Sequence, residues 1–347
     1  MTLPPTLSWD PGSCRLRYID QTKLPSRLAM VSCTTVHRLA TAIRRLEIRG
    51  APALGVAGSF GIALAAFRCK KKSRIQFLDE LENAGRFLVK TRPTAVNLSW
   101  GVERTLSVAR QAGSVAEIRS AVLAEALAIA REDEACCHAI GDHGAALLPD
   151  PCTVLTHCNA GALACSAWGT ALGVVRSSVR KGGRVSVVAC ETRPLLQGAR
   201  LTAWELVQDG IDVTVITDSM AAGFMRTGKV DCVIVGADRI TPDAVFNKIG
   251  TYMHAVCARY HAVPFYVAAP LSTFDPDHRA DDITIEERKR SEIAVCGTRA
   301  VVPDEAAVSN PSFDATPVEL VSAIITECGV LTPPFDLKAF IRRRTIT

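Results

Sequence analysis

The chain of 347 residues lacks the short motifs that would most directly indicate a bound metal or nucleotide. Its thirteen cysteines contain no C-x-x-C pair, and Cys136-Cys137-His138 has no second ligand pair at zinc-site spacing. No G-x-G-x-x-G follows a predicted strand, and no Walker A motif is present. Structural zinc, and a dinucleotide or nucleoside triphosphate site of either motif type, are therefore not expected.

The sequence is also short of concentrated charge and of long apolar runs. The formal net charge is only +5, and the two dense basic runs, Lys70-Lys71-Lys72 and Arg342-Arg343-Arg344, are not interleaved with aromatic residues. We expect them to be solvated surface, and we expect no nucleic-acid partner. The longest uncharged apolar stretch, Ala51–Phe67, is at the short limit for a membrane span, so we expect a buried helix and no membrane association.

The N-terminus lacks a charged segment followed by an apolar core, so no secretory signal is expected. The odd number of cysteines, scattered without a framework, favours a reducing intracellular setting.

Hydrophobic periodicity divides the chain into two parts. A short extended segment around Arg15–Ile19 is followed by helical spacing, which predicts the helices Val36–Glu47, Ala51–Phe67, Ile75–Lys90 and Val115–Ile140. From Pro149 onward, short β-branched runs predict strands at Thr153–His157, Arg184–Ala189, Asp212–Thr217, Cys232–Ala237 and Phe265–Ala268. Helical stretches alternate with these strands at Ala160–Val175, Gln197–Gln208, Ser219–Thr227 and Thr251–Tyr260.

This alternation is typical of βαβ units and a mainly parallel sheet. We therefore predict an α/β protein in which a helix-rich N-terminal domain, residues 1–140, precedes a doubly wound, Rossmann-like catalytic domain, residues 141–347. The boundary is expected near residues 130–150. The strongly charged segment Pro276–Glu292 is predicted to be an exposed loop or helix.

Polar residues follow four of the predicted strands: Cys158, Glu191, Asp218 and Asp238. Ligands of open α/β sheets bind at the carboxyl ends of strands, so Cys158 and Asp238 form a candidate pair for handling protons. Each has a plainer alternative, since a polar residue there can cap the next helix and a cysteine can serve packing. The Glu191 segment continues into a polar loop with Gln197 and Gly198 that would overhang the sheet edge.

A small-residue turn, Asn159–Ala162, is predicted to start the helix after Cys158. A thiol near a helix N-terminus has its pKa lowered, which favours chemistry at Cys158 over packing. If side chains alternate along the strand, His157 points to the opposite side, so a Cys–His nucleophile pair is not favoured.

Three segments could bind an anion. Arg49-Gly50-Ala51-Pro52 leads into a helix N-terminus, Arg92-Pro93-Thr94 follows a helix, and Asn247-Lys248-Ile249-Gly250-Thr251 opens another helix. Each alone is consistent with ordinary surface. Together they predict a site for a small phosphorylated ligand between the two halves of the chain.

Seven ordered segments resemble the methylthioribose-1-phosphate isomerase family over nearly the whole chain. These segments are RGAPALGV at 49–56, RPTAVNL at 92–98, THCNAG at 156–161, ETRPLLQG at 191–198, VGADRI at 235–240, NKIGT at 247–251 and NPSFDATP at 310–317. The resemblance implies an aldose–ketose isomerase of methionine salvage that uses no metal or organic cofactor, forms homodimers and is cytoplasmic, with a nuclear pool left open.

The resemblance also assigns residue roles. Asp238 would be the proton donor, and Cys158 would stabilise or relay the proton. The sugar-phosphate substrate would be held by Arg49, Gly50, Ala51, Arg92, Gln197, Asn247 and Lys248. We expect a dry, closed pocket to keep Asp238 protonated near neutral pH.

Two alternatives remain open within the same superfamily. One is a ribose-1,5-bisphosphate isomerase, because the residues that would select the sugar tail cannot be placed from sequence. The other is a non-catalytic regulatory subunit similar to those of translation initiation factor 2B. The presence of both Cys158 and Asp238, with Arg49, Arg92 and Lys248, favours an isomerase.

Overall fold

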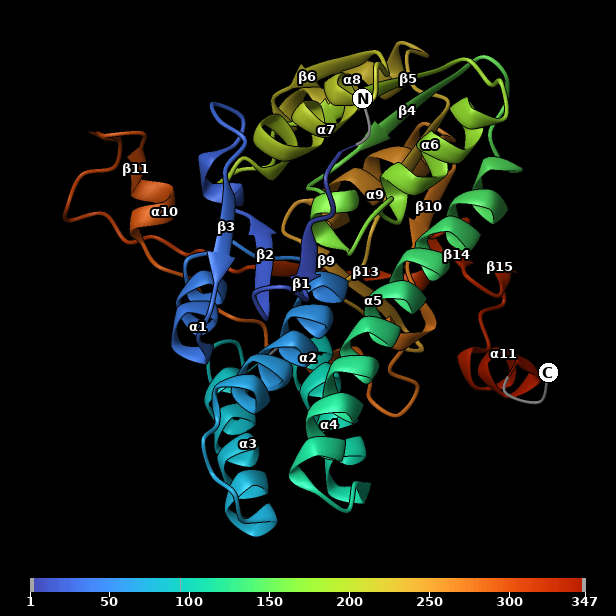
Figure 1. The fold of residues 1–347 in the computed structure, drawn as a ribbon. Coiled ribbons are helices and arrows are strands. Elements are labelled where there is room, and N and C mark those ends of the chain that lie inside the picture. The colour runs from blue at the N-terminus through green and yellow to red at the C-terminus, as the bar shows by residue number, and fades with distance from the viewer. Residues whose placement is uncertain (1–2, 94, 345–347) are drawn as a thin grey trace. The chain divides into compact units, whose positions relative to one another are not determined.

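The computed structural model describes residues 3–93 and 95–344 (Figure 1). Thr94 and the side chains of Arg343 and Arg344 lie outside the described part of the chain. The protein divides into two compact units. The N-terminal unit comprises Thr2–Cys137 and Gly161–Gly169, and the C-terminal unit comprises His138–Ala160 and Thr170–Thr347. The division falls inside one long helix, α5 (Val115–Ala145).

The N-terminal unit combines a small antiparallel sheet with a group of helices. The sheet has the order β1-β2-β3. Its strands are β1 (Leu7–Asp10), β2 (Arg15–Ile19) and β3 (Met30–Cys33), and the helices that precede α5 are α1 (Val36–Arg44), α2 (Ala51–Arg68), α3 (Arg74–Val89) and α4 (Val96–Gln111).

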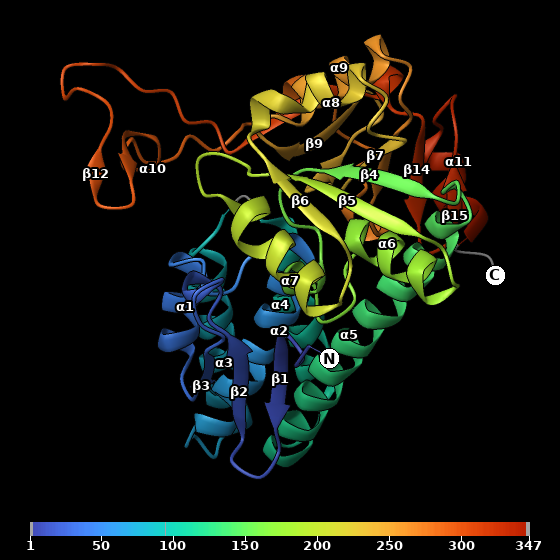
Figure 2. The ribbon, with the colours of Figure 1, turned by 90° about the horizontal axis from the view of Figure 1, so that it is seen from above.

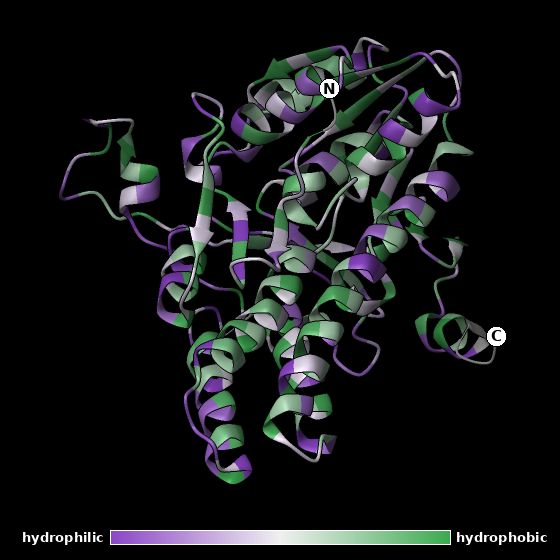
Figure 3. Cartoon of the chain, in the orientation of Figure 1, coloured by the Kyte–Doolittle hydropathy of each residue, from purple (hydrophilic) through white to green (hydrophobic). Residues whose placement is uncertain are grey.

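Helix α2 is the core of the N-terminal unit. Every residue from Ala53 to Ala66 is buried, and Figure 3 colours the helix pale to green along its length. By length and composition it could cross a membrane, but 78% of that window is buried inside the protein. A helix that is apolar all round suits such a buried position, as expected from its sequence. The predicted surface run Lys70-Lys71-Lys72 that follows it is exposed.

The C-terminal unit is built on a seven-stranded sheet in the order β15-β14-β10-β7-β4-β5-β6. All neighbouring pairs are parallel except β14 and β15. The strands are β4 (Cys152–Thr156), β5 (Val185–Cys190), β6 (Val213–Ile216), β7 (Cys232–Val235), β10 (Phe265–Ala268), β14 (Ala323–Thr326) and β15 (Gly329–Leu331).

Helices cover both faces of this sheet. Figure 2 shows α6 and α7 on one face and α8 and α9 on the other, which confirms the predicted doubly wound α/β arrangement. Their bounds are α6 (Ala171–Arg180), α7 (Ala203–Gln208), α8 (Ala221–Arg226) and α9 (Thr251–Tyr260). Buried β-branched and aromatic side chains of the central strands, among them Val233, Val267 and Phe265, form the core between the layers.

Smaller elements complete the C-terminal unit. A second, antiparallel sheet has the order β13-β9-β8, with β8 (Arg239–Ile240), β9 (Ala244–Lys248) and β13 (Phe313–Pro317). The remaining elements are α10 (Ser291–Ala294), the pair β11 (Val295–Cys296) and β12 (Arg299–Ala300), and the terminal α11 (Leu337–Arg344). The charged segment 276–292 is mostly irregular, with one 3₁₀ turn at Ala280–Asp282.

One predicted helix is wrong. Residues 160–170 form a single 3₁₀ turn, Ala162–Ala164, and irregular backbone, and α6 begins only at Ala171. Trp168 and Gly169 have positive φ angles of 62° and 87°, which a helix does not accommodate. The backbone N–H of Thr6 donates to Ser166 O, so this segment is part of the N-terminal unit and does not continue strand β4 into a helix.

Candidate active site

The candidate pair follows two neighbouring strands at the point where the strand order reverses. In the sheet, β5 and then β6 follow on one side of β4, and β7 is the neighbour of β4 on its other side. Val154 and Leu155 of β4 pair with Cys232 and Val233 of β7 in parallel register. Cys158 lies two residues beyond β4, and Asp238 lies three residues beyond β7. A reversal of this kind leaves a crevice at the carboxyl ends of the strands, where ligands of doubly wound proteins bind.

Two threonine hydroxyls hold the backbone of Cys158. Its N–H donates to Thr192 Oγ1 at 2.8 Å, and its carbonyl accepts from Thr202 Oγ1 at 2.7 Å. The half-buried Cys158 has a φ of 65°, a left-handed conformation that is costly for a residue with a Cβ atom. The two hydroxyls therefore fix the thiol-bearing residue in a conformation that it would rarely adopt alone.

No α-helix starts beside Cys158 in the described structure. The segment after Cys158 contains only one 3₁₀ turn before α6 begins at Ala171. A helix macrodipole therefore does not explain a reactive thiol here. The threonine contacts replace it as the local feature that sets Cys158 apart from a packing cysteine.

Asp218 supports the same loop. Its carboxylate accepts the N–H of Thr192 at 2.8 Å and the N–H of Arg193 at 2.7 Å. Thr192 itself has a φ of 66°, so Asp218 stabilises the strained turn that carries the Thr192 hydroxyl. Asp218 begins a 3₁₀ turn without capping it through its side chain, so the capping alternative does not describe its role.

The loop after β5 approaches the sheet edge closely. Glu191 follows β5 directly, and its carbonyl accepts the N–H of Ala199. A Cβ atom on Gly198 would lie 1.7 Å from the carbonyl oxygen of Cys190, so only glycine fits. The neighbouring Gln197 is 6% exposed, and its Oε1 has no hydrogen-bond partner within the described ranges. A buried, unpaired amide oxygen is costly and is suited to accept a hydrogen bond from a ligand hydroxyl.

Asp238 connects β7 to the small antiparallel sheet. Its backbone N–H donates to Phe246 O at 2.8 Å, which fixes it at the start of the β8–β9 hairpin. The expectation that Asp238 is protonated near neutral pH stays a prediction.

Asn247 and Lys248 end strand β9 before α9. Asn247 is buried and donates through Nδ2 to Thr251 Oγ1 at 3.0 Å. Lys248 Nζ donates to Ser312 O at 2.9 Å and lies 4.8 Å from the centre of the Phe313 ring. These contacts orient both side chains from within the unit.

The N-terminus of α9 is already engaged by a carboxylate. Asp314 accepts the N–H of Gly250 at 2.7 Å and that of Tyr252 at 3.2 Å. Burial raises the pKa of Asp314 to about 6, against the lowering effect of these two hydrogen bonds. The sequence interpretation of this segment as a source of anion-binding amides is therefore wrong for these two N–H groups, while the Lys248 charge remains. The carboxylate that occupies these N–H groups was visible in the sequence, because Asp314 lies in the last of the seven motifs, NPSFDATP at 310–317.

Four predicted substrate residues lie in the N-terminal unit. Arg49 Nε donates to Gln21 Oε1 at 2.9 Å, and Gly50 and Ala51 form the start of α2. Gly50 has a φ of 91°, and a Cβ there would lie 2.6 Å from backbone atoms of Ala164. Arg92 follows α3, and its backbone N–H donates to Val89 O at 3.2 Å.

A buried ionic network next to Cys158 was not predicted. Asn159 Nδ2 donates to Glu205 Oε1 at 2.9 Å, and Arg176 pairs with Glu205 at 2.8 Å and with Asp209 at 2.6 Å. Glu205 is fully buried, so its charge depends on these donors. Its members lie on α6, α7 and the Cys158 loop, and their sequence spacing gives no sign of the contact.

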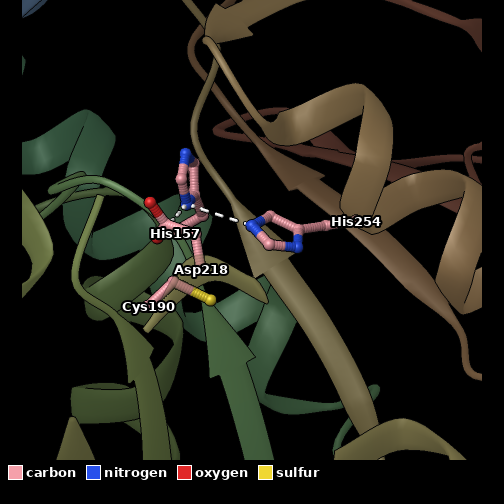
Figure 4. Close-up of side chains that lie close together, drawn as sticks. All are labelled: His157, Cys190, Asp218 and His254. Atoms are coloured by element: carbon pink, nitrogen blue, oxygen red, sulfur yellow. Dashed lines mark hydrogen bonds and ion pairs between the residues drawn. The ribbon is translucent and has the colours of Figure 1, made fainter. Parts of the chain in front are cut away.

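His157, the neighbour of Cys158 in the chain, belongs to a second group of buried side chains. Figure 4 shows His157, Cys190, Asp218 and His254 close together. His157 Nε2 lies 2.9 Å from Ile249 O, and its Nδ1 lies 3.1 Å from His254 Nε2. Burial lowers the pKa of His157 to about 4 and that of His254 to about 3, so both imidazoles are neutral at pH 7.

The chain belongs to the Initiation factor 2 subunit family, whose family model matches residues 47–333. Within this family, the chain is 50% identical over 341 residues to the methylthioribose-1-phosphate isomerase of Roseiflexus castenholzii, covering 95% of each sequence. The solved structure of 5-methylthioribose 1-phosphate isomerase from Pyrococcus horikoshii is 42% identical and has a TM-score of 0.92, with 99% of this chain and 97% of that chain covered.

A third relative carries a different name. The structure titled translation initiation factor eIF-2B, subunit delta, from A. fulgidus is 53% identical, with a TM-score of 0.88 and coverage of 96% of this chain and 97% of that chain. Both names therefore occur among proteins that share this fold and about half of this sequence.

Proposed function

We propose that this protein is an aldose–ketose isomerase that converts 5-methylthioribose 1-phosphate to 5-methylthioribulose 1-phosphate in methionine salvage. An enzyme with this activity is classified as an intramolecular oxidoreductase, because one carbon of the substrate is oxidised while its neighbour is reduced. Two kinds of observation support this: the isomerase names of relatives that match almost the whole chain, and the site itself. The single structural observation that carries the proposal is the position of Cys158 and Asp238 beyond the adjacent strands β4 and β7.

The chemistry requires an acid and a second polar group. The substrate is a furanose whose anomeric oxygen bears phosphate, so the ring cannot open to a free aldehyde. Asp238 donates a proton to the ring oxygen as the bond from that oxygen to C1 breaks. The hydrogen on C2 then moves to C1, the C2 hydroxyl loses its proton, and a ketone forms at C2. Cys158 stabilises or relays the migrating proton.

Substrate binding is part of the same proposal. Lys248 carries a positive charge for the phosphate, and the buried Oε1 of Gln197 accepts a hydrogen bond from a sugar hydroxyl. The remaining proposed substrate-binding residues are Asn247, Arg49, Gly50, Ala51 and Arg92.

The decisive experiment supplies the purified chain with three substrates in parallel. Turnover of 5-methylthioribose 1-phosphate, with ribose 1,5-bisphosphate at least tenfold slower in kcat/KM, is the expected result. Faster turnover of the bisphosphate would replace the proposed substrate, and ribose 5-phosphate serves as the control with a free anomeric centre. No turnover of any of them would favour the regulatory-subunit alternative, to which the eIF-2B name of the A. fulgidus structure corresponds.

Solvent isotope incorporation separates the two routes for hydrogen transfer. In D₂O, deuterium at C1 of the product requires an enediol-like intermediate that exchanges with solvent. Complete retention of the substrate hydrogen indicates a direct hydride shift or a shielded proton transfer.

A homodimer is also proposed, with the outer face of α9 as its contact. Tyr252, Val256 and Tyr260 recur every four residues on this helix and are 46%, 41% and 84% exposed. Exposed side chains along one helix face can pair with the same face of a second copy about a twofold axis. Tyr260→Glu should shift the mass measured by light scattering towards the monomer, while Ile75→Glu, an exposed apolar residue of α3, should not.

A cytoplasmic location, with a nuclear pool left open, completes the proposal. The thirteen cysteines stand as thiols, and such a thiol content suits a compartment that keeps cysteines reduced. Imaging of the tagged chain in its own cells would test this location.

A further inference from the structure

Four potential metal ligands meet behind the candidate active site. They are His157 after β4, Cys190 at the end of β5, Asp218 after β6 and His254 on α9 (Figure 4). One donor atom from each lies within 4.8 Å of the donor atoms of the others. Both histidines and the cysteine are at most 1% exposed, and Asp218 is partly buried. The four residues come from four separate segments, so their sequence spacing gives no sign of the cluster.

The orientation of His157 is that of a metal ligand. Its Nε2 lies 2.9 Å from Ile249 O, which places the ring proton on Nε2 and leaves a lone pair on Nδ1. That Nδ1 faces His254 Nε2 at 3.1 Å and Asp218 Oδ1 at 3.8 Å. Metal-bound histidines commonly donate their second ring N–H to a backbone carbonyl, which fixes the tautomer and the ring orientation.

Asp218 is held in the same manner. The N–H groups of Thr192 and Arg193 each donate to one of its carboxylate oxygens. These two bonds aim Oδ1 at the cluster without neutralising the carboxylate. Two imidazole nitrogens, a carboxylate and a thiol therefore converge, and a hydrogen bond already joins the two imidazoles.

We propose that this cluster is a structural zinc site. Zinc takes four ligands of the types nitrogen, oxygen and sulfur at tetrahedral positions. With zinc–nitrogen bonds of about 2.0–2.1 Å, two tetrahedral nitrogens lie roughly 3.3 Å apart. The 3.1 Å and 3.8 Å separations at His157 Nδ1 bracket this value, so small side-chain movements bring the donors to bonding distance. Four protein ligands leave no open position for substrate.

Proton balance on binding is simple. Cys190 binds as the thiolate and releases one proton to solvent. His254 binds through Nε2, so its proton moves to Nδ1, an atom that is buried and has no hydrogen-bond partner in the described residues. His157 keeps its proton on Nε2. No oxidation or reduction takes place.

Zinc at this position would join the ends of three parallel strands to α9. Two of these connections lead directly to Cys158: His157 is its neighbour in the chain, and Asp218 holds the turn with the Thr192 hydroxyl that binds it. The metal would act by fixing this loop, and it stays outside the chemistry proposed above.

A second group of potential ligands provides an internal comparison. Asp133, Cys137 and Cys165 of the N-terminal unit also have donor atoms within 4.8 Å. This group offers only three ligands, one fewer than the four that structural zinc sites take. Zinc bound to this second group would be retained when His254 or Cys190 is replaced. The zinc content of these variants therefore shows which of the two groups binds the metal.

The test measures metal content and cobalt spectra of the untagged, full-length chain. After growth with added zinc and removal of loose metal by gel filtration, the chain should carry close to one equivalent of zinc. Replacement by Co²⁺ should give visible bands of tetrahedral cobalt and a near-ultraviolet thiolate charge-transfer band. His254→Leu and Cys190→Ser should lose at least nine-tenths of the zinc, and Cys190→Ser should lose the charge-transfer band.

Matched controls exclude binding elsewhere. Cys257→Ser on α9 and Cys165→Ser in the second group should keep full zinc content. Because a variant of a buried cluster could fail to fold, melting of the chain is compared with and without zinc: the unmodified chain should melt several degrees higher with zinc, and folded His254→Leu should show no such shift.

The proposal is overturned if the unmodified chain holds less than a tenth of an equivalent and melts at the same temperature with and without zinc. The cluster is then held by hydrogen bonds, among them the one between the two imidazoles and the one from His157 to Ile249 O. It is equally overturned if His254→Leu and Cys190→Ser retain zinc while Cys165→Ser loses it.

Discussion

The hydroxyl of Thr192 accepts the backbone N–H of Cys158 at 2.8 Å, and both residues have left-handed backbone, with φ angles of 66° and 65°. Two β-carbon-bearing residues in this conformation face each other at the ends of adjacent strands β4 and β5. Strain of this kind persists only where surrounding contacts enforce it, and it concentrates at functional sites. The pair is therefore a device that positions the Cys158 thiol.

The Thr192 hydroxyl should affect kcat more than KM. Thr192→Val keeps the shape but removes the acceptor for the Cys158 N–H, so the thiol loses its fixed position. Misplacement of a catalytic group by about 1 Å costs on the order of 100-fold, and we expect kcat to fall roughly 10- to 100-fold.

Steady-state kinetics with 5-methylthioribose 1-phosphate measure this effect. Thr192→Ser keeps the hydroxyl and should retain most activity, and Thr214→Val, at an exposed position of β6, should change nothing. Equal loss in the Val and Ser variants would contradict a role for the hydroxyl.

Removal of either member of the candidate pair should abolish most turnover without unfolding the protein. A general acid or base contributes on the order of 10²–10⁴-fold, so Asp238→Asn and Cys158→Ser should each lower kcat by about that factor. Neither change alters side-chain volume greatly, and circular dichroism spectra should remain unchanged. The kinetics of Cys257→Ser, a change of the same type on α9, should match the unmodified chain. Full activity in both variants would remove the catalytic assignment.

The sequence predicted the parallel sheet well because its signals are local. The β-branched runs predicted both ends of β4, β5, β6 and β7 to within two residues of their observed bounds. The predicted bounds of β10 and α9 agree with the structure. Cys158 and Asp238 could be assigned to one sheet edge because the carboxyl ends of parallel strands meet there. The strand order was not predicted, since β7 pairs with β4 and not with β6, which precedes it in the chain.

Other elements left no clear local signal. Helix α4 presents small and polar residues to its neighbour α2: a Cβ on Gly101 would lie 2.0 Å from Gly55 O, and Thr105 donates to Ser59 Oγ. The buried face of α4 therefore mixes small and polar residues with Leu98, Val102 and Leu106, which weakens its apolar pattern. Strand β13 pairs with β9 from a distant part of the chain, so Asp314 reaches the start of α9 only through tertiary structure.

Replacement of Gly198 by alanine should destabilise the loop that carries Gln197. The new Cβ would lie 1.7 Å from Cys190 O, and backbone atoms on both sides would have to move. Backbone clashes of this kind belong to the mechanisms with the largest effects, and we expect a loss of about 2–4 kcal/mol in the free energy of unfolding. Gly223→Ala on the exposed side of α8 has open space around its Cβ and should stabilise by at most about 1 kcal/mol. Urea unfolding of both variants measures the difference, and equal stabilities would refute the close approach of this loop to β5.

Asp314 should make stability depend on pH in mildly acidic solution. Its pKa is about 6 in the folded chain, raised by burial from an ordinary value of 3.8. Between these two values the folded chain binds more protons than the unfolded chain, so the stability contributed by Asp314 falls as pH rises through this window. The full shift corresponds to about 3 kcal/mol at 1.36 kcal/mol per pKa unit, and partial exposure to solvent reduces this to about 1–2 kcal/mol.

Asp314→Asn tests this dependence because the amide keeps an acceptor for the N–H of Gly250 and cannot ionise. The difference in unfolding free energy between the variant and the unmodified chain should therefore change in favour of the variant as pH rises from 3.8 to about 6 and then become constant. Asp79→Asn, at an exposed position of α3, provides the control and should follow the unmodified chain. A constant difference between Asp314→Asn and the unmodified chain across this window would show that the Asp314 carboxyl titrates in the folded protein as it does in the unfolded one.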